Sequence, residues 1–196
     1  MDKYDASNDH YCYQDTVTLK NKLDIRDMEE LEKAERDITV ITAQRIVFSR
    51  PPYDLEYMQH LHFQLFSELY EWAGELRSVD ISKGDTRFCN TGRITAEANK
   101  LLTKLENDNW LSNMSKDEFC DKVAEYYCEF NMIHPFREGN GRVQRVLFDH
   151  LSLAAGYDLD WGDIDQNEWI QANIEGFYVN YGPMSEIFRR IVTICA

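Results

Sequence analysis

Apolar residues recur every three to four positions along most of the chain, which is the period of amphipathic helices and not of strands. The first such stretch starts at Asp27, and Arg50 is expected to end it because the residue before a proline disfavours helical backbone. A second helix is expected to follow at once and to run into Trp72-Ala-Gly74, where Gly74 can serve as the C-cap. The apolar stripes of these two helices comprise Met28, Leu31, Ile38, Ile41 and Ile46, and then Leu55, Met58, His62, Leu65, Phe66 and Leu69.

Residues 77–89 interrupt the helical period. Apolar and polar residues alternate there around a central Lys83-Gly-Asp-Thr86 turn, a pattern typical of a β-hairpin. Helical spacing then resumes from Ile94 to Leu105. The chain is therefore predicted to be an all-α protein that carries one short hairpin.

The next predicted helix has clear signals at both ends. Ser115 and Glu118 form the sequence pattern of a capping box at its start. The helix must stop at His134, because Pro135 has no N–H group and its ring clashes with the preceding turn.

Three further helices are predicted in the C-terminal part of the chain. The apolar positions from Val143 to Ala154 form one buried face, closed by Gly156 as a C-cap. Another helix is expected around residues 166–178. The last is expected after Pro183 and carries Ile187, Ile191 and Ile194.

Length and composition indicate one globular domain, residues 1–196, because 43% of the residues are hydrophobic and 29% are charged. The N-terminus is polar and acidic, and no apolar run approaches a membrane span, so a cytoplasmic protein is expected. Five scattered cysteines without a CxxC pair argue against a zinc site or a disulfide framework. The formal net charge of -14 argues against direct nucleic-acid binding and favours a basic partner, although solubility alone also accounts for it.

The stretch HPFREGNGR, residues 134–142, holds the densest group of reactive side chains. Gly139 and Gly141 permit backbone conformations that other residues resist, so successive N–H groups can turn inward at the start of the next helix and bind an anion. Arg142 and Arg145 lie on one face of that helix and can reach oxygens of one di- or triphosphate. An arginine in a first helical turn opposes the macrodipole, which also favours a bound anion.

Glu138 and His134 add two chemical functions to this anion site. A carboxylate beside a phosphate would repel it unless a cation intervenes, and one carboxylate plus phosphate oxygens is the usual arrangement around Mg²⁺. His134 is a candidate general base, because histidine ordinarily titrates near neutral pH. Each feature alone is typical of a turn or of a packed histidine, whereas their ordered combination between two helices favours a phosphate site.

The stretch HPFREGNGRVQR resembles the signature of the Fic family, H-x-F-x-(D/E)-G-N-G-R-x-x-R, at every specified position. Tyr70-Glu-Trp-Ala-Gly74 and the hairpin are similar to the helix end and the flap that precede the Fic core, and most of the chain resembles the short, stand-alone Fic toxins of bacteria. The resemblance implies a single helical Fic domain with the hairpin beside the active site. It also implies transfer of AMP from ATP to a Tyr, Ser or Thr hydroxyl of a target protein.

The same resemblance assigns roles to the residues of the motif, 134–145. His134 would take the proton from the attacking hydroxyl, Phe136 would anchor the loop in the core, and Glu138 would bind Mg²⁺ between the α and β phosphates. Gly139, Asn140 and Gly141 would form the anion hole, Arg142 would hold the β phosphate and Arg145 the γ phosphate.

Two further groups of residues are expected to contact the substrates. By resemblance, an extended target segment would add main-chain hydrogen bonds to the flap. The flap residues are Ser82, Lys83, Gly84, Asp85, Thr86, Arg87 and Phe88. The late aromatic segment is a candidate adenine and ribose pocket, although aromatic residues at helical spacing are also typical of a core. The pocket candidates are Asn173, Tyr178 and Tyr181, with Trp169 and Phe177.

By resemblance to the Fic family, the lack of an inhibitory helix motif in this sequence implies that a separate protein regulates it. Many Fic proteins carry an inhibitory helix, (S/T)-x-x-x-E-(G/N), whose glutamate pairs with the arginine at the Arg145 position. Neither 67–72 nor 171–176 fits it: the first ends in Trp72, and the second lacks the hydroxyl. By resemblance, the chain would be the toxin of a toxin–antitoxin pair, with an antitoxin glutamate near Arg145 and a bacterial type II topoisomerase subunit as the target.

Two alternative functions stay open at this point. A Doc-type protein kinase or another phosphate transferase could use the same scaffold, but that branch resembles a pattern with Ala at the Gly139 position and Lys at the Gly141 position. A non-enzymatic nucleotide-binding module is the other alternative, and a broken motif would be expected for it.

Overall fold

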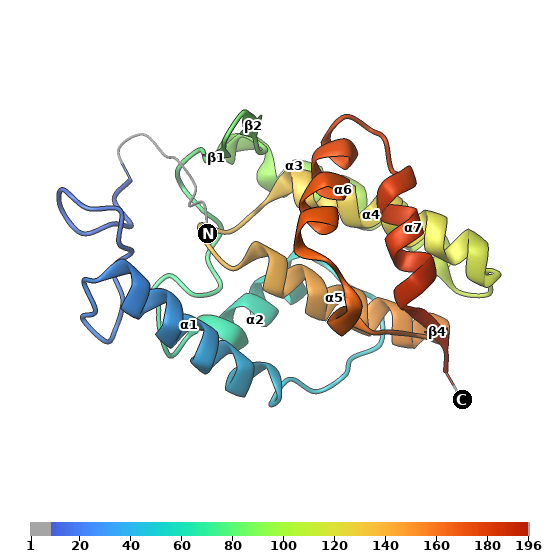
Figure 1. Cartoon of the computed structure of the whole chain (residues 1–196), viewed down its shortest axis with the longest axis horizontal. Helices are drawn as coiled ribbons and strands as arrows, with labels where there is room; N and C mark the ends of the chain where they lie inside the picture. Colours follow the sequence, from blue (N-terminus) through green and yellow to red (C-terminus); the bar gives the residue numbers. More distant parts are fainter. Residues whose placement is uncertain (1–8, 196) are drawn as a thin grey trace.

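The computed structural model describes residues 9–195, apart from the side chain of Asp163, and these residues are mainly helical (Figure 1). The helices are α1 (Met28–Ala43), α2 (Leu55–Phe66), α3 (Ile94–Asn107), α4 (Lys116–Ile133), α5 (Asn140–Ala155), α6 (Gln166–Phe177) and α7 (Gly182–Ile191). The strands are β1 (Ser82–Lys83), β2 (Thr86–Arg87), β3 (Tyr157–Leu159) and β4 (Val192–Ile194). Short 3-10 helices are η1 (Thr91–Arg93), η2 (Asn109–Leu111) and η3 (Trp161–Asp163). The predicted all-α class with a short hairpin is confirmed.

Side-chain caps begin several of these helices where the sequence predicts a start. Asp27 accepts hydrogen bonds from two N–H groups of the first turn of α1, and Asp54 accepts one at α2. At α4, Ser115 and Glu118 make both bonds of the capping box. These caps satisfy N–H groups that have no partner within the helix, and each typically contributes about 1 kcal/mol.

Two helix ends differ from the prediction. The first helix ends at Ala43 and not at Arg50, because the N–H groups of Arg45 and Ile46 turn back onto the carbonyls of Thr42 and Ala43. The second ends at Phe66, before Gly74. The N–H of Gly74 instead donates to the ring of His62, so this glycine closes a turn that folds back against α2.

The buried face of α1 also differs from the predicted stripe. Ile41 is 51% exposed, and the buried positions are Leu31, Glu35, Thr39 and Thr42. The hydroxyl of Thr42 donates to the carbonyl of Leu65 at 3.0 Å, so the helix packs on α2 through polar as well as apolar groups.

The C-terminal end of the chain forms a strand where the sequence predicts helix. Helix α7 stops at Ile191, and β4 then pairs antiparallel with β3. Ile194 is therefore paired with Tyr157 and is 72% exposed, and is not part of a helical stripe. This second pairing joins the end of α5 to the end of α7.

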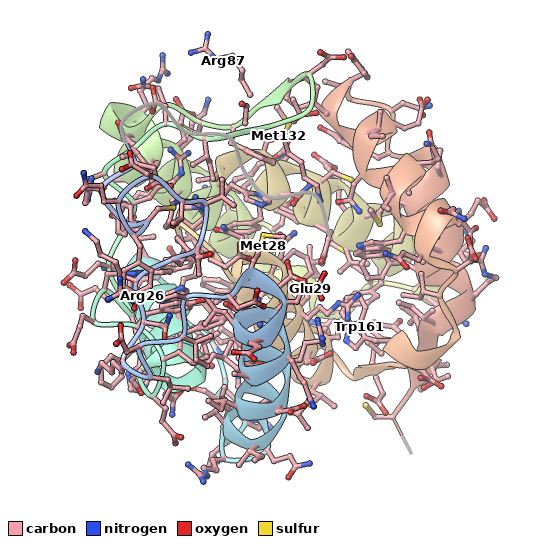
Figure 2. All side chains as sticks on the ribbon, turned by 60° about the vertical axis from the view of Figure 1, so that its left-hand side comes forward. Arg26, Met28, Glu29, Arg87, Met132 and Trp161 are labelled. Atoms are coloured by element: carbon pink, nitrogen blue, oxygen red, sulfur yellow. The ribbon has the colours of Figure 1, made fainter. Side chains whose placement is uncertain are left out.

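The first hairpin is shorter than residues 77–89. Ser82 pairs with Arg87 and Lys83 with Thr86, and Gly84 supplies the positive φ of the turn between them. In Figure 2 the side chain of Arg87 points outward from this hairpin, while Met132 lies beneath it.

Helix α4 is the centre of the core and packs against α3, α5, α6 and α7, while α1 packs on α2 and α2 on α5 (Figure 1). Residues 134–139 join α4 to α5. Of the helices described, none combines the length and apolar character needed to cross a membrane.

Candidate active site

The loop between α4 and α5 is held by its own side chains. His134, the C-cap of α4, has a left-handed backbone (φ 45°), which is an uncommon conformation for a side-chain-bearing residue. Phe136 is fully buried and stacks on His62 at 4.1 Å between ring centroids. The Asn140 amide accepts from the N–H of Phe136 and donates to its carbonyl, both at 2.8 Å. The loop is therefore fixed before any ligand binds.

The two glycines of the motif have different roles. Gly139 has φ +79°, and a Cβ added there would lie 2.2 Å from the Phe66 ring. Gly141 lies within helix α5, has no positive φ, and a Cβ there would meet open space. The expectation that both need unusual backbone is therefore wrong for Gly141, where the missing side chain leaves room in front of the helix.

The start of α5 presents backbone donors to that space. Arg142 and Val143 N–H groups bond to the carbonyl of Gly139, and the Gly139 N–H donates to the Glu138 carboxylate at 2.8 Å. Within residues 9–195, the N–H groups of Asn140 and Gly141 have no protein acceptor. Two adjacent donors at the positive end of a helix form an anion-binding arrangement.

His134 is buried in its neutral form. Its Nδ1 lies 2.5 Å from the carbonyl oxygen of Asn131 and must donate, because a carbonyl only accepts. Burial lowers the pKa of His134 to about 3, so the lone pair resides on Nε2 at neutral pH. Phe88, at the end of the hairpin, stacks on the imidazole at 3.8 Å between centroids. The side chain thus has the tautomer that a general base needs at Nε2.

Arg77 connects the hairpin to the loop between α4 and α5 and was not singled out from the sequence. Its guanidinium is buried and donates to the carbonyls of His134 and Val79, each at 2.8 Å, and to that of Cys89. Its own N–H donates to Pro135 at 2.9 Å. One side chain therefore ties both ends of the hairpin to the end of α4.

Glu138 has the environment of a carboxylate that a cation could stabilise. Its side chain is 21% exposed, and desolvation and the nearby Glu35 raise its pKa. His62 holds its backbone in place: the ring accepts from Gly74 through Nδ1, so Nε2 donates to the carbonyl of Glu138 at 3.1 Å. A hard oxygen donor beside the open N–H groups of α5 fits the arrangement in which Mg²⁺ is bound by one carboxylate and phosphate oxygens.

The two arginines of the motif occupy different surroundings. Arg142 is ion-paired with Glu35 of α1, lies 3.7 Å from Glu138, and its guanidinium sits 4.7 Å from the centre of the Phe66 ring. Arg145 is exposed, and its guanidinium lies 5.3 Å from the Trp161 ring centre and 5.8 Å from that of Trp169.

Residues of the candidate adenine pocket differ in their contacts and exposure. Asn173 accepts a hydrogen bond from Asn131 at 3.0 Å, next to the contact that orients His134. Tyr178 is 71% exposed, whereas Tyr181 is half-buried, with its hydroxyl 3.4 Å from a Glu129 oxygen. The pocket assignment stays a prediction, and Asn173 is linked to the motif through Asn131.

Residues 52–152, from just before the N-cap of α2 to the last turn of α5, match the sequence model of the Fic/DOC family. The chain belongs to the Fic/DOC family.

Similarity to known proteins extends beyond residues 52–152. "Probable protein adenylyltransferase Fic" of Escherichia coli K12 is 37% identical over 192 residues, which cover 98% of this chain and 96% of that protein. "Protein adenylyltransferase VbhT" of Bartonella schoenbuchensis is 35% identical over 195 residues, 98% of this chain and 41% of VbhT.

The fold is also shared with solved Fic structures. BepC of Bartonella tribocorum, solved with bound AMPPNP, has a TM-score of 0.88 and 30% identity, and the match covers 95% of this chain and 97% of that one. A Bartonella quintana Fic domain solved with bound ADP has a TM-score of 0.86 and 30% identity, covering 94% and 95% of the two chains.

Several residues that shape this Fic site lie outside the motif. Glu35 could have been found, because it lies four residues after Leu31 and four before Thr39, on the buried face of α1. Trp161 and Arg77 carry no comparable signal, since their contacts join segments distant in sequence.

Proposed function

We propose that this chain is a protein adenylyltransferase, acting in the cytoplasm, that transfers AMP from ATP to a Tyr, Ser or Thr hydroxyl of a target protein. The observation that carries the proposal is the fold of the motif: a neutral His134 at the end of α4 directly precedes a helix start with two open N–H donors. Relatives named as protein adenylyltransferases and a relative solved with an ATP analogue support the same reaction.

In this proposal His134 acts as the general base. The target hydroxyl oxygen forms a bond to the α phosphorus, its proton passes to Nε2, and the bond between the α phosphorus and the oxygen leading to the β phosphorus breaks. Diphosphate leaves. Proton transfer to a positioned base typically contributes about two to four orders of magnitude.

The remaining groups bind and neutralise the phosphates. The N–H groups of Asn140 and Gly141 face the α and β phosphates, Arg142 holds the β phosphate and Arg145 the γ phosphate. Glu138 would hold Mg²⁺, which would supply charge neutralisation at the phosphates. Asn173, Tyr178 and Tyr181 are the proposed contacts of the adenosine.

The hairpin is proposed to dock the target. A short antiparallel pair with an exposed turn can accept an extended segment as an additional strand. Phe88 covers His134 at the base of this hairpin, so a docked hydroxyl would approach the imidazole along it.

Labelled ATP tests the reaction. Incubating the protein with a bacterial extract and ATP labelled at the α phosphorus should leave label on a protein, while label at the γ phosphorus should leave with diphosphate. His134→Ala should abolish transfer and retain most ATP binding. Label from the γ position on protein would indicate a kinase, and label from neither position would indicate a nucleotide-binding module.

We further propose that the chain is a toxin held inactive by a separate antitoxin, with a type II topoisomerase subunit as the target. The two internal glutamates nearest the inhibitory pattern are engaged elsewhere: Glu71 pairs with Lys22, and Glu175 accepts from Asn180. Arg145 is exposed and accessible to a glutamate from another protein.

A helical peptide with the pattern (S/T)-x-x-x-E-(G/N) tests the antitoxin contact. The peptide should inhibit AMP transfer, and the same peptide with Ala in place of Glu should not. Inhibition that persists in Arg145→Ala would place the contact elsewhere. Mass spectrometry of the labelled extract tests the target, and a modified protein other than a topoisomerase subunit would reject that assignment.

A further inference from the structure

Helix α1 carries a carboxylate on its buried face. Glu35 is 9% exposed and lies between Leu31 and Thr39 on the side that packs on α2. A buried carboxylate has a large desolvation penalty and is normally retained only where polar groups compensate it.

Both oxygens of this carboxylate have partners in the described structure. The hydroxyl of Tyr70, which is 1% exposed, donates to Oε2, and Nη2 of Arg142 donates to Oε1. Thr39 accepts from Nη1 of Arg142 at 3.3 Å, while its own hydroxyl donates to the Glu35 carbonyl at 2.7 Å. Two residues one helical turn apart thus hold one side of the Arg142 guanidinium.

The third contact of Arg142 is apolar. Its guanidinium lies 4.7 Å from the centre of the Phe66 ring, and the side chain remains 31% exposed. A free arginine side chain loses about 2 kcal/mol of conformational entropy when it is fixed. Here Glu35, Thr39 and Phe66 fix it before a ligand arrives, and a guanidinium has five N–H donors, so donors remain for phosphate oxygens.

The contacts of Glu35 favour a role in holding the Arg142 guanidinium in place over a role in blocking its access to phosphate. Glu35 is anchored from behind by Tyr70 in the core. If a phosphate displaced it from Arg142, the carboxylate would stay buried without its cation, and leaving one partner of a buried pair alone is strongly unfavourable. A phosphate is therefore expected to join this cluster at its exposed side and not to replace Glu35.

We propose that Glu35 is a positioning residue that fixes the Arg142 guanidinium for the β phosphate of ATP, with Thr39 and Tyr70 in support. The inference rests on the proposed function, in which Arg142 holds that phosphate. It adds an element outside the Fic motif, α1, to the nucleotide site.

Calorimetric titration of the whole chain with ATP, ADP and AMP tests the inference without using AMP transfer. Glu35→Gln should bind ATP and ADP roughly tenfold more weakly, because a charged hydrogen bond is lost, and should bind AMP as the unaltered chain does. The matched control is Glu32→Gln, since Glu32 lies on the same helix and only approaches Arg36, at 4.0 Å. The control should bind all three nucleotides normally.

A double-mutant cycle separates positioning from a general loss of structure. In an Arg142→Ala background, Glu35→Gln should cause no further loss of ATP affinity. If Glu35→Gln does not fold, Thr39→Val carries the same test, with a smaller selective loss for ATP and ADP.

Different results would refute the positioning role of Glu35, the phosphate contact of Arg142 or the proposed reaction. A folded Glu35→Gln or Thr39→Val with unchanged ATP affinity, or with equal losses for ATP and AMP, would refute positioning, and tighter ATP binding would show that Glu35 competes with phosphate. Normal ATP affinity in Arg142→Ala would refute the phosphate assignment on which the inference rests. Absence of AMP transfer despite the selective ATP loss would refute only the proposed reaction.

Discussion

Replacing Gly139 with alanine should destabilise the protein, whereas the same change at Gly141 should not. At Gly139 the added Cβ would lie 2.2 Å from the Phe66 ring, and φ is +79°. Left-handed backbone costs alanine about 1–2 kcal/mol. Crowding in a packed core adds about 1–3 kcal/mol. The expected loss is therefore roughly 2–5 kcal/mol, or about 10 °C in Tm for a chain of this size.

Gly141→Ala is the matched control within the same motif. It lies in helix α5 with open space around the new Cβ, and alanine favours helix by up to about 1 kcal/mol relative to glycine. Its Tm should therefore be unchanged or slightly higher. Its ATP affinity should fall, because the methyl group would occupy the space in front of the N–H donors.

Thermal and urea unfolding, followed by titration with ATP, would measure both effects. A Gly139→Ala variant as stable as the unaltered chain would refute the packing argument, and so would a Gly141→Ala variant that loses comparable stability. The Phe66→Leu background provides a further check: if the ring causes the clash, Gly139→Ala should cost less there.

Three other predictions concern residues around the motif. Because burial lowers the pKa of His134 to about 3, between about pH 6.5 and pH 3 the unfolded chain binds a proton at this residue that the folded chain does not. As the pH is lowered through this window, the free energy of unfolding should therefore decrease by about 1.4 kcal/mol per pH unit more than it does in His134→Asn. Equal pH slopes of the two proteins in urea unfolding would contradict this. Arg77→Met should lose roughly 3 kcal/mol or more in urea unfolding, since buried carbonyls lose a charged donor, with exposed Arg87→Met as the neutral control. Trp161→Ala should weaken ATP binding about fivefold in calorimetry through loss of its contact with Arg145, and an equal loss for AMP would refute that origin.

Local signals predicted the parts of this fold that depend on local physics. The capping box of Ser115 and Glu118 and the proline after His134 set the limits of α4, since caps and proline act within one helical turn. The hairpin turn around Gly84 was likewise found, although only two residues pair on each side.

Features that depend on contacts between distant segments were not predicted. The polar face of α1 with Glu35 is compensated by Tyr70 and Arg142, which lie 35 and 107 residues away in sequence. The pairing of β3 with β4 joins two segments whose apolar residues also suit a helix, and Ile194 was assigned to the wrong element for that reason. Periodicity reports which side of a segment is apolar, and it contains no information about such partners.

The arginines around the motif explain how a chain with a formal net charge of -14 can offer an anion site. Arg137 pairs with Asp9 at 2.5 Å, Arg142 pairs with Glu35, and Arg145 lies against aromatic rings. Each cation is thus held in place by a neighbour, and charges farther away than about 10 Å are largely screened at ordinary ionic strength. We therefore expect phosphate affinity at the proposed site to depend on the geometry of the fixed guanidinium and N–H donors more than on the acidic surface elsewhere.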